Sequence, residues 1–490
     1  MNRRRLPLAG VLTAVVVAAA AAVATPIRPG PPLHFRPAVY IDNQLAGSEG
    51  FVIEHAKSHR LIYATHEGTT LLYRSGLLAS PVGDADFLTT YRNQVNLWTS
   101  ADTGKSWQRV NLAGTGFFTT PTTNAGFSDP DLTQDAGGTI YGAGIDLVND
   151  AVFSSPDGGK SWPTGNVQCH NGDRPWLAGG RPGEVFLSTD SSDLGHIVVR
   201  STDSGASCSS TSASASGTMQ GGSWNGYGKI FYDLRSGALV EPAIFTQGGS
   251  TGLGLAVLPH AEHAFDSGTG LAFRASVAVP NTSVNTFWKA VAAVDRAGTT
   301  YVVWTTDARG GGSAGCNGTP SPVANDLMMV STPDLGVTWS KPVVLVHTGR
   351  TLLWPWVVAG SGGNISVSWM SYDRVTDPDC APAGATVRLY TRDVLGWKGT
   401  RTVMTPKLDV VGRPIHAGNI CQQGTACNAG VGDRRLGEFF TTAMDHRGCV
   451  MFAAGDTMRT DPVTGGQLPT ARGIFTIQSG GPSLTGGTCN

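Results

Sequence analysis

The sequence predicts an all-β fold, a β-propeller of four-stranded blades, and two repeated patterns carry that prediction. The first is an eight-residue motif, written SADTGKSW at 100–107, which returns in similar form at 155–162, 201–208 and 332–339. The second is a pair of short strands joined by a Gly-containing turn, and we count seven such pairs. Four-stranded sheets repeated around an axis form a propeller, and no long helical periodicity competes with that interpretation.

Each copy of the eight-residue motif is predicted to be the turn of a β-hairpin. Short β-forming runs such as NLWT and DLMMV precede it, and a further strand follows. An Asp side chain can bond to its own backbone, and Gly accepts a positive φ, so the Asp and the Gly of the motif suit a tight turn.

The seven strand pairs predict seven blades, with six as the alternative if one pair is an insertion. The segment RPAVYI at 36–41 is a candidate outer strand for the last blade. The predicted blades span 49–112, 126–168, 172–220, 224–282, 285–349, 352–408 and 433–480.

The N-terminus predicts export. Three arginines at 3–5, an apolar run and the small residues at 22–24 are typical of a signal peptide over 1–24. A Pro-rich tether is expected over 25–34 and a single propeller domain over 35–490. No later apolar run is long enough to span a membrane, so we expect a secreted, monomeric protein.

The charge balance disfavours two classes of partner. Thirty-five basic residues face 36 acidic ones, which argues against nucleic acid or an anionic membrane surface as the main partner.

Eight cysteines indicate an oxidising compartment. Pairing of nearest neighbours predicts four disulfides, Cys169 with Cys208, Cys316 with Cys380, Cys421 with Cys427 and Cys449 with Cys489. A metal site at the CQQGTAC spacing is the alternative, and we expect none there.

The pattern S-x-D-x-G-x-[ST]-W resembles the Asp-box, or BNR repeat, of sialidases (neuraminidases) and other secreted propellers, which implies a secreted bacterial member of that superfamily. The resemblance implies a carbohydrate ligand in a central funnel, with each Asp-box on the hairpin of the two outer strands, away from that ligand. It also implies a Tyr nucleophile and three Arg around a sugar carboxylate. The Arg-Ile-Pro motif of catalytic sialidases is missing, because Phe35-Arg36-Pro37 lacks the Ile and Thr69 stands where a second Arg is expected.

Catalytic candidates come from the strand ends that face the mouth of a propeller. Glycoside hydrolysis needs a carboxylic acid and a second group as base or nucleophile. Asp129 and Asp131, in FSDPDL, are the acid candidates, since i, i+2 spacing places both on one side of a strand. Tyr372 is the nucleophile candidate, and Glu438 is a further carboxylate. Turn capping, an exposed rim tyrosine and a structural ion pair are the respective alternatives.

Substrate-binding candidates are arginines and tryptophans at the same mouth. A guanidinium can hold a carboxylate with two parallel hydrogen bonds, and an indole face can stack on a sugar ring. The alternative for the arginines is a repeated structural pair with a nearby Asp. The candidates are Arg174, Arg309, Arg374, Arg435, Arg459, Trp176, Trp288 and Trp356.

Two functions follow from these residues. One is a glycoside hydrolase that uses the channel carboxylates, and the other is a propeller that binds a glycan or a protein without catalysis. No cofactor is expected, and calcium in the axial channel is left open.

Overall fold

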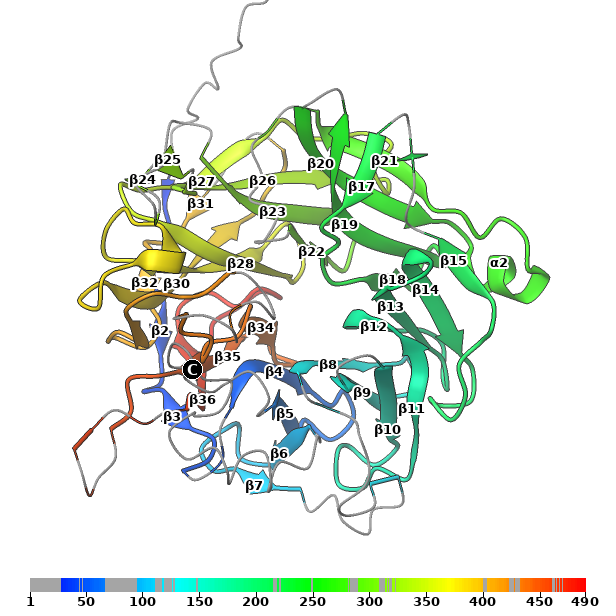
Figure 1. Cartoon of the computed structure of the whole chain (residues 1–490), viewed down its shortest axis with the longest axis horizontal. Coiled ribbons are helices and arrows are strands. Elements are labelled where there is room, and N and C mark those ends of the chain that lie inside the picture. The colour runs from blue at the N-terminus through cyan, green and yellow to red at the C-terminus, as the bar shows by residue number, and fades with distance from the viewer. Residues whose placement is uncertain are drawn as a thin grey trace, which may run out of the picture.

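The computed structural model describes residues 28–43, 45, 47–66, 95–110, 117–118, 126, 128–146, 149–214, 218–219, 222–247, 250–280, 282, 290–307, 313–314, 316, 320–321, 323–399, 403–422, 427, 432–460, 463, 465–466, 468 and 470–490. Within them, seven sheets, antiparallel apart from one short strand at the edge of the sixth, surround a central axis (Figure 1). The predicted propeller with seven blades is confirmed, and the six-blade alternative is wrong. The expected signal peptide at 1–24 lies outside the described residues.

The first three blades follow the chain from the innermost strand outwards. Blade 1 contains β4 (Ser48–Glu54), β5 (Leu61–His66), β6 (Asn96–Ser100) and β7 (Gln108–Arg109). Blade 2 contains β8 (Ser128–Gln134), β9 (Ile140–Asp146), β10 (Asn149–Ser155) and β11 (Thr164–Asn171). Blade 3 contains β12 (Asp173–Gly179), β13 (Val185–Ser191), β14 (Gly195–Ser201) and β15 (Ser212–Ser214).

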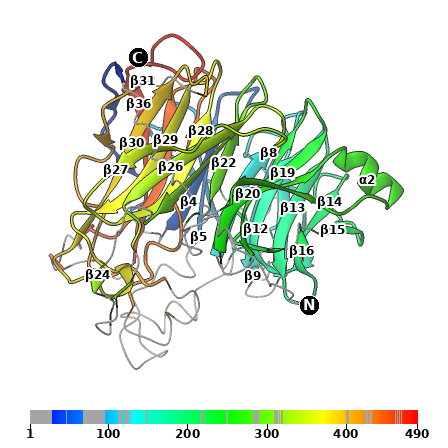
Figure 2. The same cartoon turned by 90° about the horizontal axis from the view of Figure 1, so that it is seen from above.

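Blades 4 and 5 carry additions. In blade 4 the innermost position is divided between β17 (Gly222–Asn225) and β18 (Phe231–Asp233), both paired with β19 (Ala238–Gln247). Its other strands are β16 (Thr218–Met219), β20 (Ser250–Leu258) and β21 (Arg274–Val279). Helix α2 (Ala261–Ser267) lies at the periphery (Figure 2). Blade 5 contains β22 (Val291–Val294), β23 (Thr300–Thr306), β26 (Asp326–Thr332) and β27 (Val343–His347), and β24 (Ser313–Ala314) pairs with β25 (Pro320–Ser321).

Blade 6 receives strands from two distant parts of the chain. It contains β28 (Leu352–Ala359), β29 (Ile365–Tyr372), β30 (Thr386–Leu395) and β31 (Val403–Met404). The short strands β32 (Leu408–Asp409) and β33 (His416–Ala417) also pair with β30, and the 3-10 helix η1 (Pro378–Cys380) precedes β30. From the N-terminal part, β1 (Arg28–Pro29) runs parallel to β31, and Leu33 is buried. Arg28, Pro29 and Leu33, which belong to the expected tether, thus pair with or pack on the propeller.

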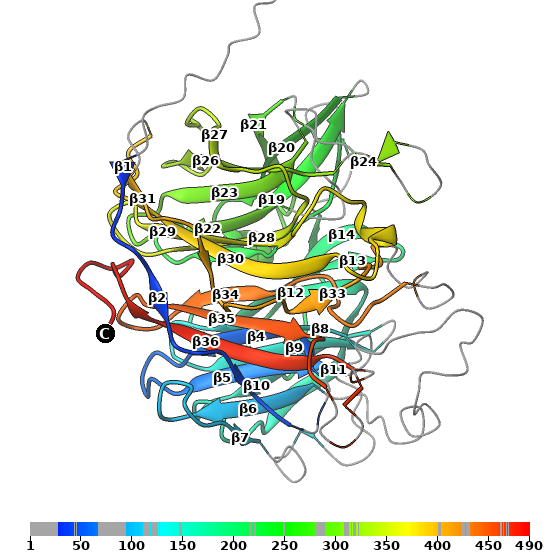
Figure 3. The ribbon, with the colours of Figure 1, turned by 90° about the vertical axis from the view of Figure 1, so that its left-hand side faces the viewer.

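The N-terminal residues also close the ring. Blade 7 contains β34 (Thr441–Met444), β35 (Val450–Asp456) and β36 (Arg472–Gly480). Its outer position is filled by β2 (His34–Phe35) and β3 (Val39–Tyr40), both antiparallel to β36, as Figure 3 shows from the side. The predicted closure by 36–41 is confirmed, so β2 and β3 from the N-terminal part of the chain share one sheet with its last strand, β36.

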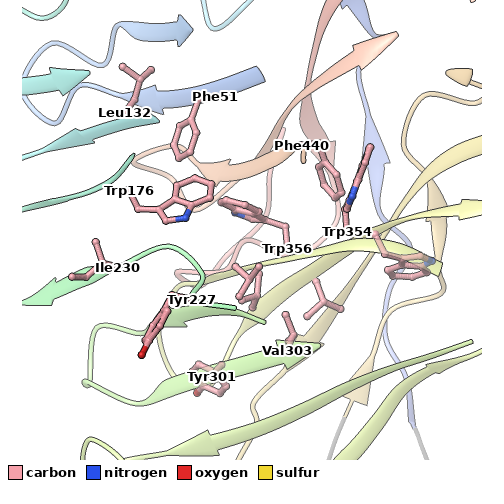
Figure 4. Close-up of a cluster of buried hydrophobic side chains, with 14 of the residues drawn as sticks. Phe51, Leu132, Trp176, Tyr227, Ile230, Tyr301, Val303, Trp354, Trp356 and Phe440 are labelled. Atoms are coloured by element: carbon pink, nitrogen blue, oxygen red, sulfur yellow. The ribbon is translucent and has the colours of Figure 1, made fainter. Parts of the chain in front are cut away.

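Burial on both faces explains the composition of the central strands. Blades pack face to face, so β23 (TYVVWTT) and β29 (ISVSWMSY) are buried along their whole length. Both are rich in β-branched and aromatic residues, which pack well on a pleated surface. The largest buried cluster extends around the ring, and Figure 4 shows part of it from Phe51 to Tyr301.

The four copies of the repeated motif fold alike, each joining the two outer strands of its blade. In the first, Asp102 Oδ1 accepts hydrogen bonds from the amides of Lys105 and Ser106, both at 3.0 Å. The Gly104 amide donates to Ser100 Oγ at 2.9 Å. Gly104 has φ 80°, and a Cβ atom there would lie 2.0 Å from the Phe475 ring. Close packing of the turn against the neighbouring blade therefore requires glycine.

The structure joins all eight cysteines in the pairs that nearest-neighbour pairing predicts, namely Cys169–Cys208, Cys316–Cys380, Cys421–Cys427 and Cys449–Cys489. Bridges of this number fit an extracellular protein. Among the described residues, no helix is both long and apolar enough to cross a membrane.

Candidate functional site

A pocket opens on the propeller axis, at the face where the innermost strands begin. Its enclosed volume is about 50 Å³, which is less than a sugar ring needs, so a larger ligand would reach it with one group and lie across its mouth. Six blades contribute to the lining, which consists of Asp129, Arg174, Trp176, Gly228, Lys229, Val291, Trp354, Pro355, Trp356, Glu438 and Phe439.

A repeated bulge directs side chains into this pocket. In four blades the register between the two inner strands shifts at the start of the innermost strand. The second residue of each bulge has a positive φ, 47° at Glu49, 54° at Asp129, 61° at Arg174 and 44° at Trp354. Such values are unusual for residues with a side chain and are concentrated at functional sites. The bulge therefore re-aims three pocket side chains and Glu49 beneath them.

Glu438 lies in an ion-pair network that crosses blades. Its Oε2 atom is 2.7 Å from Arg174 Nη2 of blade 3, and its Oε1 atom contacts Arg434 of its own blade. Buried Glu49 accepts a hydrogen bond from the Glu438 amide at 2.6 Å and one from the Asp129 amide at 3.3 Å. Two guanidinium groups thus favour the ionised form of Glu438, and Glu49 fixes the backbone of both pocket acids.

The pKa of Asp129 is raised well above the usual range of an aspartic acid. Burial is the largest cause, and the negative charges of Glu49, Asp173 and Glu438 raise it further. Arg174 acts in the opposite direction but does not compensate. Asp129 can therefore hold a proton at a pH at which an exposed aspartate has lost it.

Asp131 does not join Asp129 in the pocket. Its side chain is fully buried, with Oδ1 accepting from the Leu132 amide at 2.7 Å and Oδ2 from the Leu177 amide at 2.6 Å. It also pairs with Lys229 Nζ. The i, i+2 spacing does not bring both carboxyl groups into the pocket, because the Leu177 amide and Lys229 hold that of Asp131. Burial raises the pKa of Asp131 and lowers that of Lys229, against their mutual attraction.

Aromatic side chains line much of the pocket, and Figure 4 shows two of them, Trp176 and Trp356, close to one another. The ring centroids of Trp176 and Phe439 are 5.3 Å apart, and those of Trp356 and Phe439 are 6.5 Å apart with nearly parallel planes. Lys229 Nζ lies 5.9 Å from the Trp176 ring and 4.9 Å from that of Phe51. Among the described residues, Trp176 Nε1 has no hydrogen-bond partner, which leaves a buried donor for a ligand oxygen.

Several predicted site residues lie elsewhere. Tyr372 is buried, its hydroxyl donates to the Gly418 carbonyl at 3.0 Å, and burial raises its pKa strongly. A nucleophilic role for Tyr372 is not supported by this placement.

Of the predicted arginines that the structure describes, Arg174 alone lines the pocket. Arg435 is buried and bound to Asp433 through both Nε and Nη2. Exposed Arg374 pairs with Asp373 at 2.8 Å, and Arg459 donates to Asn43 Oδ1 at 2.7 Å. These contacts match the structural alternative for both Arg435 and Arg374. Arg309 and Trp288 lie outside the described residues.

Sequence reasoning therefore placed Asp129, Glu438, Arg174, Trp176 and Trp356 in one pocket. It missed Phe439 and Val291, which are apolar, and it missed the bulge. A signal for the bulge exists in the four-residue strings SEGF, SDPD, DRPW and LWPW, which share Gly or Pro at the third position.

A larger hollow, about 480 Å³, lies between blades 5 and 6 and includes Trp339, Trp397 and Lys398. Its carboxylate, Asp295, is occupied by the amides of Ala297 and Thr299, both at 2.9 Å, and by the Tyr301 hydroxyl. No reactive arrangement results, so the axial pocket is the better candidate.

Comparison with known proteins identifies no family. No protein-family model matches the sequence, and no curated protein matches it. Solved structures that resemble the chain include an ulvan lyase, a polysaccharide lyase, with 10% identity over 85% of this chain and 92% of that chain and a TM-score of 0.44. The leech intramolecular trans-sialidase has 12% identity over 89% and 70%, with a TM-score of 0.40. YCF48 bound to a peptide has 11% identity over 93% and 99%, with a TM-score of 0.41. Carbohydrate-acting propellers are thus among the similar structures, at a level that identifies no activity.

Proposed function

We propose that this protein is a secreted, carbohydrate-active propeller that cleaves a glycosidic bond in the axial pocket. The observation that carries the proposal is the presence of two carboxyl groups with opposite tendencies in one pocket. Burial and neighbouring acids favour the protonated form of Asp129, whereas Arg174 and Arg434 favour the ionised form of Glu438. Glycoside hydrolysis needs such a pair.

The roles follow from those protonation states. Protonated Asp129 would donate its proton to the glycosidic oxygen as the bond to the leaving sugar breaks. Ionised Glu438 would then accept a proton from the attacking water, or would itself attack the anomeric carbon and be released by water in a second step. Arg174 lies against Glu438 and acts on the charge of Asp129, so it would position both acids.

The proposed ligand is a glycan because the pocket combines an aromatic lining with hydrogen-bonding groups at its edge. Trp176 supplies a buried indole donor, and Lys229 adds a positive charge beside the rings. The small enclosed volume suits one sugar substituent or one ring edge, with the remainder of the glycan across the mouth. A sialic acid substrate is not proposed, because the Arg-Ile-Pro motif is missing.

One observation favours the second candidate, a propeller that binds a glycan without cleaving it. Both carboxylate oxygens of Glu438 are already held by arginines, which is also the arrangement of a structural ion pair. In that case the pocket would present a fixed set of charges and rings to its ligand, and neither acid would transfer a proton.

The test is a screen of the secreted protein against fluorogenic glycosides and polysaccharides, with Asp129→Asn and Glu438→Gln in parallel. We expect turnover of at least one substrate and a loss of about 100-fold or more in kcat for each variant, with KM changed less. The control is Asp266→Asn, which removes a carboxylate whose side chain is 69% exposed.

Full activity of Asp129→Asn would exclude Asp129 as the proton donor. Absence of turnover, together with glycan-array binding that Trp176→Ala abolishes, would favour the binding propeller.

A further inference from the structure

A second group of chemically active side chains lies at the opposite face of the ring, where blade 7 meets blade 1. His59 is in the hairpin between β4 and β5, and His446 is in the hairpin between β34 and β35. Glu54, at the end of β4, lies between them. One nitrogen from each histidine and one carboxylate oxygen lie within 4.8 Å of one another.

The three side chains converge on one oxygen atom. Glu54 Oε1 is 2.7 Å from His446 Nδ1 and 3.3 Å from His59 Nδ1. The two imidazole rings lie side by side, with centroids 3.8 Å apart. Glu54 is 6% exposed, whereas the histidines are 48% and 44% exposed, so the group is anchored on the protein side and open to solvent on the other.

Comparison with other blades shows that the turn itself does not need His446. The same turn is built in blades 2 and 5, where Asp135 and Asp295 each accept two backbone amides, as Asp445 does in blade 7. The residue after the Asp is Ala136 in blade 2, Arg296 in blade 5 and His446 in blade 7. An alanine therefore suffices at this position.

The acceptor on the neighbouring blade also differs. The amides of Ala136 and Arg296 donate to the carbonyl oxygens of Gly180 and Gly360, both at 3.0 Å. The His446 amide donates instead to Glu54 Oε2. Glu54 thus uses one oxygen to hold the turn, which leaves Oε1 facing the two imidazoles.

The backbone of His59 is also specialised. His59 has φ 54°, and its amide donates to the His55 carbonyl at 2.9 Å, which fixes a tight turn. A positive φ is uncommon for a residue with a side chain. Here it holds the imidazole against that of His446 instead of leaving it free in solvent.

We propose that Glu54, His59 and His446 form a binding site for a divalent transition-metal ion, with Zn²⁺ as the ion of choice. Neutral imidazole nitrogens and one carboxylate oxygen are ligands that Zn²⁺ prefers, and three protein ligands leave one position for water. The site takes ligands from blades 1 and 7. A bound ion would therefore link the two blades at the seam where the propeller closes.

The test is calorimetric titration of untagged protein with Zn²⁺ in EDTA-free buffer after removal of metal. We expect one ion per chain, and a binding constant at least tenfold weaker in His446→Ala, His59→Ala and Glu54→Gln. The control is His263→Ala, which removes an exposed histidine on α2. His446→Ala introduces the residue that blade 2 has in the same turn, so this variant keeps its fold, which the thermal midpoint in EDTA checks.

A second measurement has a readout other than affinity. At a Zn²⁺ concentration about 100 times Kd, the thermal midpoint of the wild type should rise by roughly 3 °C, and that of His446→Ala should not rise. Zinc binding by His59→Ala and His446→Ala equal to that of the wild type would overturn the proposal, as would no binding by the wild type. Neither result bears on the axial pocket.

Discussion

Asp393 provides a test of how burial controls the pH dependence of stability. It lies in β30 of blade 6, opposite Ser366 of β29, and its side chain is fully buried. Burial raises its pKa to about 7, and Ser366 lowers the pKa only in part. Among the described residues, neither carboxylate oxygen has a hydrogen bond of ordinary geometry, which explains why the ionised form is so disfavoured.

The sign and size of the effect follow from linkage. The folded pKa of about 7 exceeds the ordinary value of 3.8, so the contribution to stability is fully present below pH 3.8 and is lost as the pH rises through 7. Between pH 5 and pH 8 the free energy of unfolding should fall by the equivalent of about two pKa units. At about 1.36 kcal/mol per unit this fall is roughly 3 kcal/mol. For a chain of this length the unfolding entropy is about 1 kcal/mol/K, so the thermal midpoint should fall by roughly 3 °C from this residue alone.

The assay is thermal unfolding of the wild type and of Asp393→Asn at pH 5 and at pH 8. Asparagine cannot ionise, so the variant should lose about 3 °C less than the wild type over this interval. The change in midpoint with pH is the readout, because the amide also needs a hydrogen-bond acceptor and alters the absolute stability. Asp266→Asn is the control for removal of one negative charge. Parallel pH profiles for the wild type and Asp393→Asn would refute the argument.

Three further predictions follow from other parts of the fold. His196 lies between Glu241 and Asp190. Burial alone lowers the pKa of His196, but the two acids outweigh it and raise the pKa to about 9. The stability of the wild type should therefore fall as the pH rises through 9. The fall should be smaller in His196→Gln, measured by thermal midpoints at pH 7 and pH 10. Asp102→Ala should lower the free energy of unfolding by about 1 kcal/mol, as the loss of a helix N-cap does, because four hydrogen bonds to the Asp102 carboxylate disappear. Denaturant titration measures this change, and an unchanged denaturation midpoint would contradict the prediction. Deletion of residues 28–41 should abolish the cooperative thermal transition, because it exposes the edge of β36. The control is a chain that begins at residue 28 and keeps both outer strands.

The fold could be predicted because each blade carries its own local signals. The four turns around Asp102, Asp157, Asp203 and Asp334 use only residues close in sequence, so their composition reveals them directly. Ring closure by 36–41 was also predictable, since a strand without a partner at one end of the chain matches a missing outer strand at the other.

The candidate site was less predictable because its geometry depends on contacts between blades. Asp131 has the residue type of a catalytic acid, but the Leu177 amide and Lys229, from blades 3 and 4, determine that it is buried. The role of Tyr372 depends on a contact within its own blade but distant in sequence, with Gly418, 46 residues away. Residue type and strand position indicate which end of a blade a side chain occupies, but not whether a neighbouring blade covers it.

The bulges at the mouth of the channel support a functional origin more strongly than the residue types do. A side chain at positive φ costs on the order of 1–3 kcal/mol, a cost that glycine avoids. Blade 7 shows that the fold does not require this conformation. Phe439 lies five residues before Met444, the last paired residue of β34, as Asp129 lies five residues before Gln134 of β8, and Phe439 is not at positive φ. Four blades nevertheless keep Glu49, Asp129, Arg174 and Trp354 in this conformation. The propeller fold does not require these side chains, so the strain is best explained by the chemistry of the pocket that they form or support.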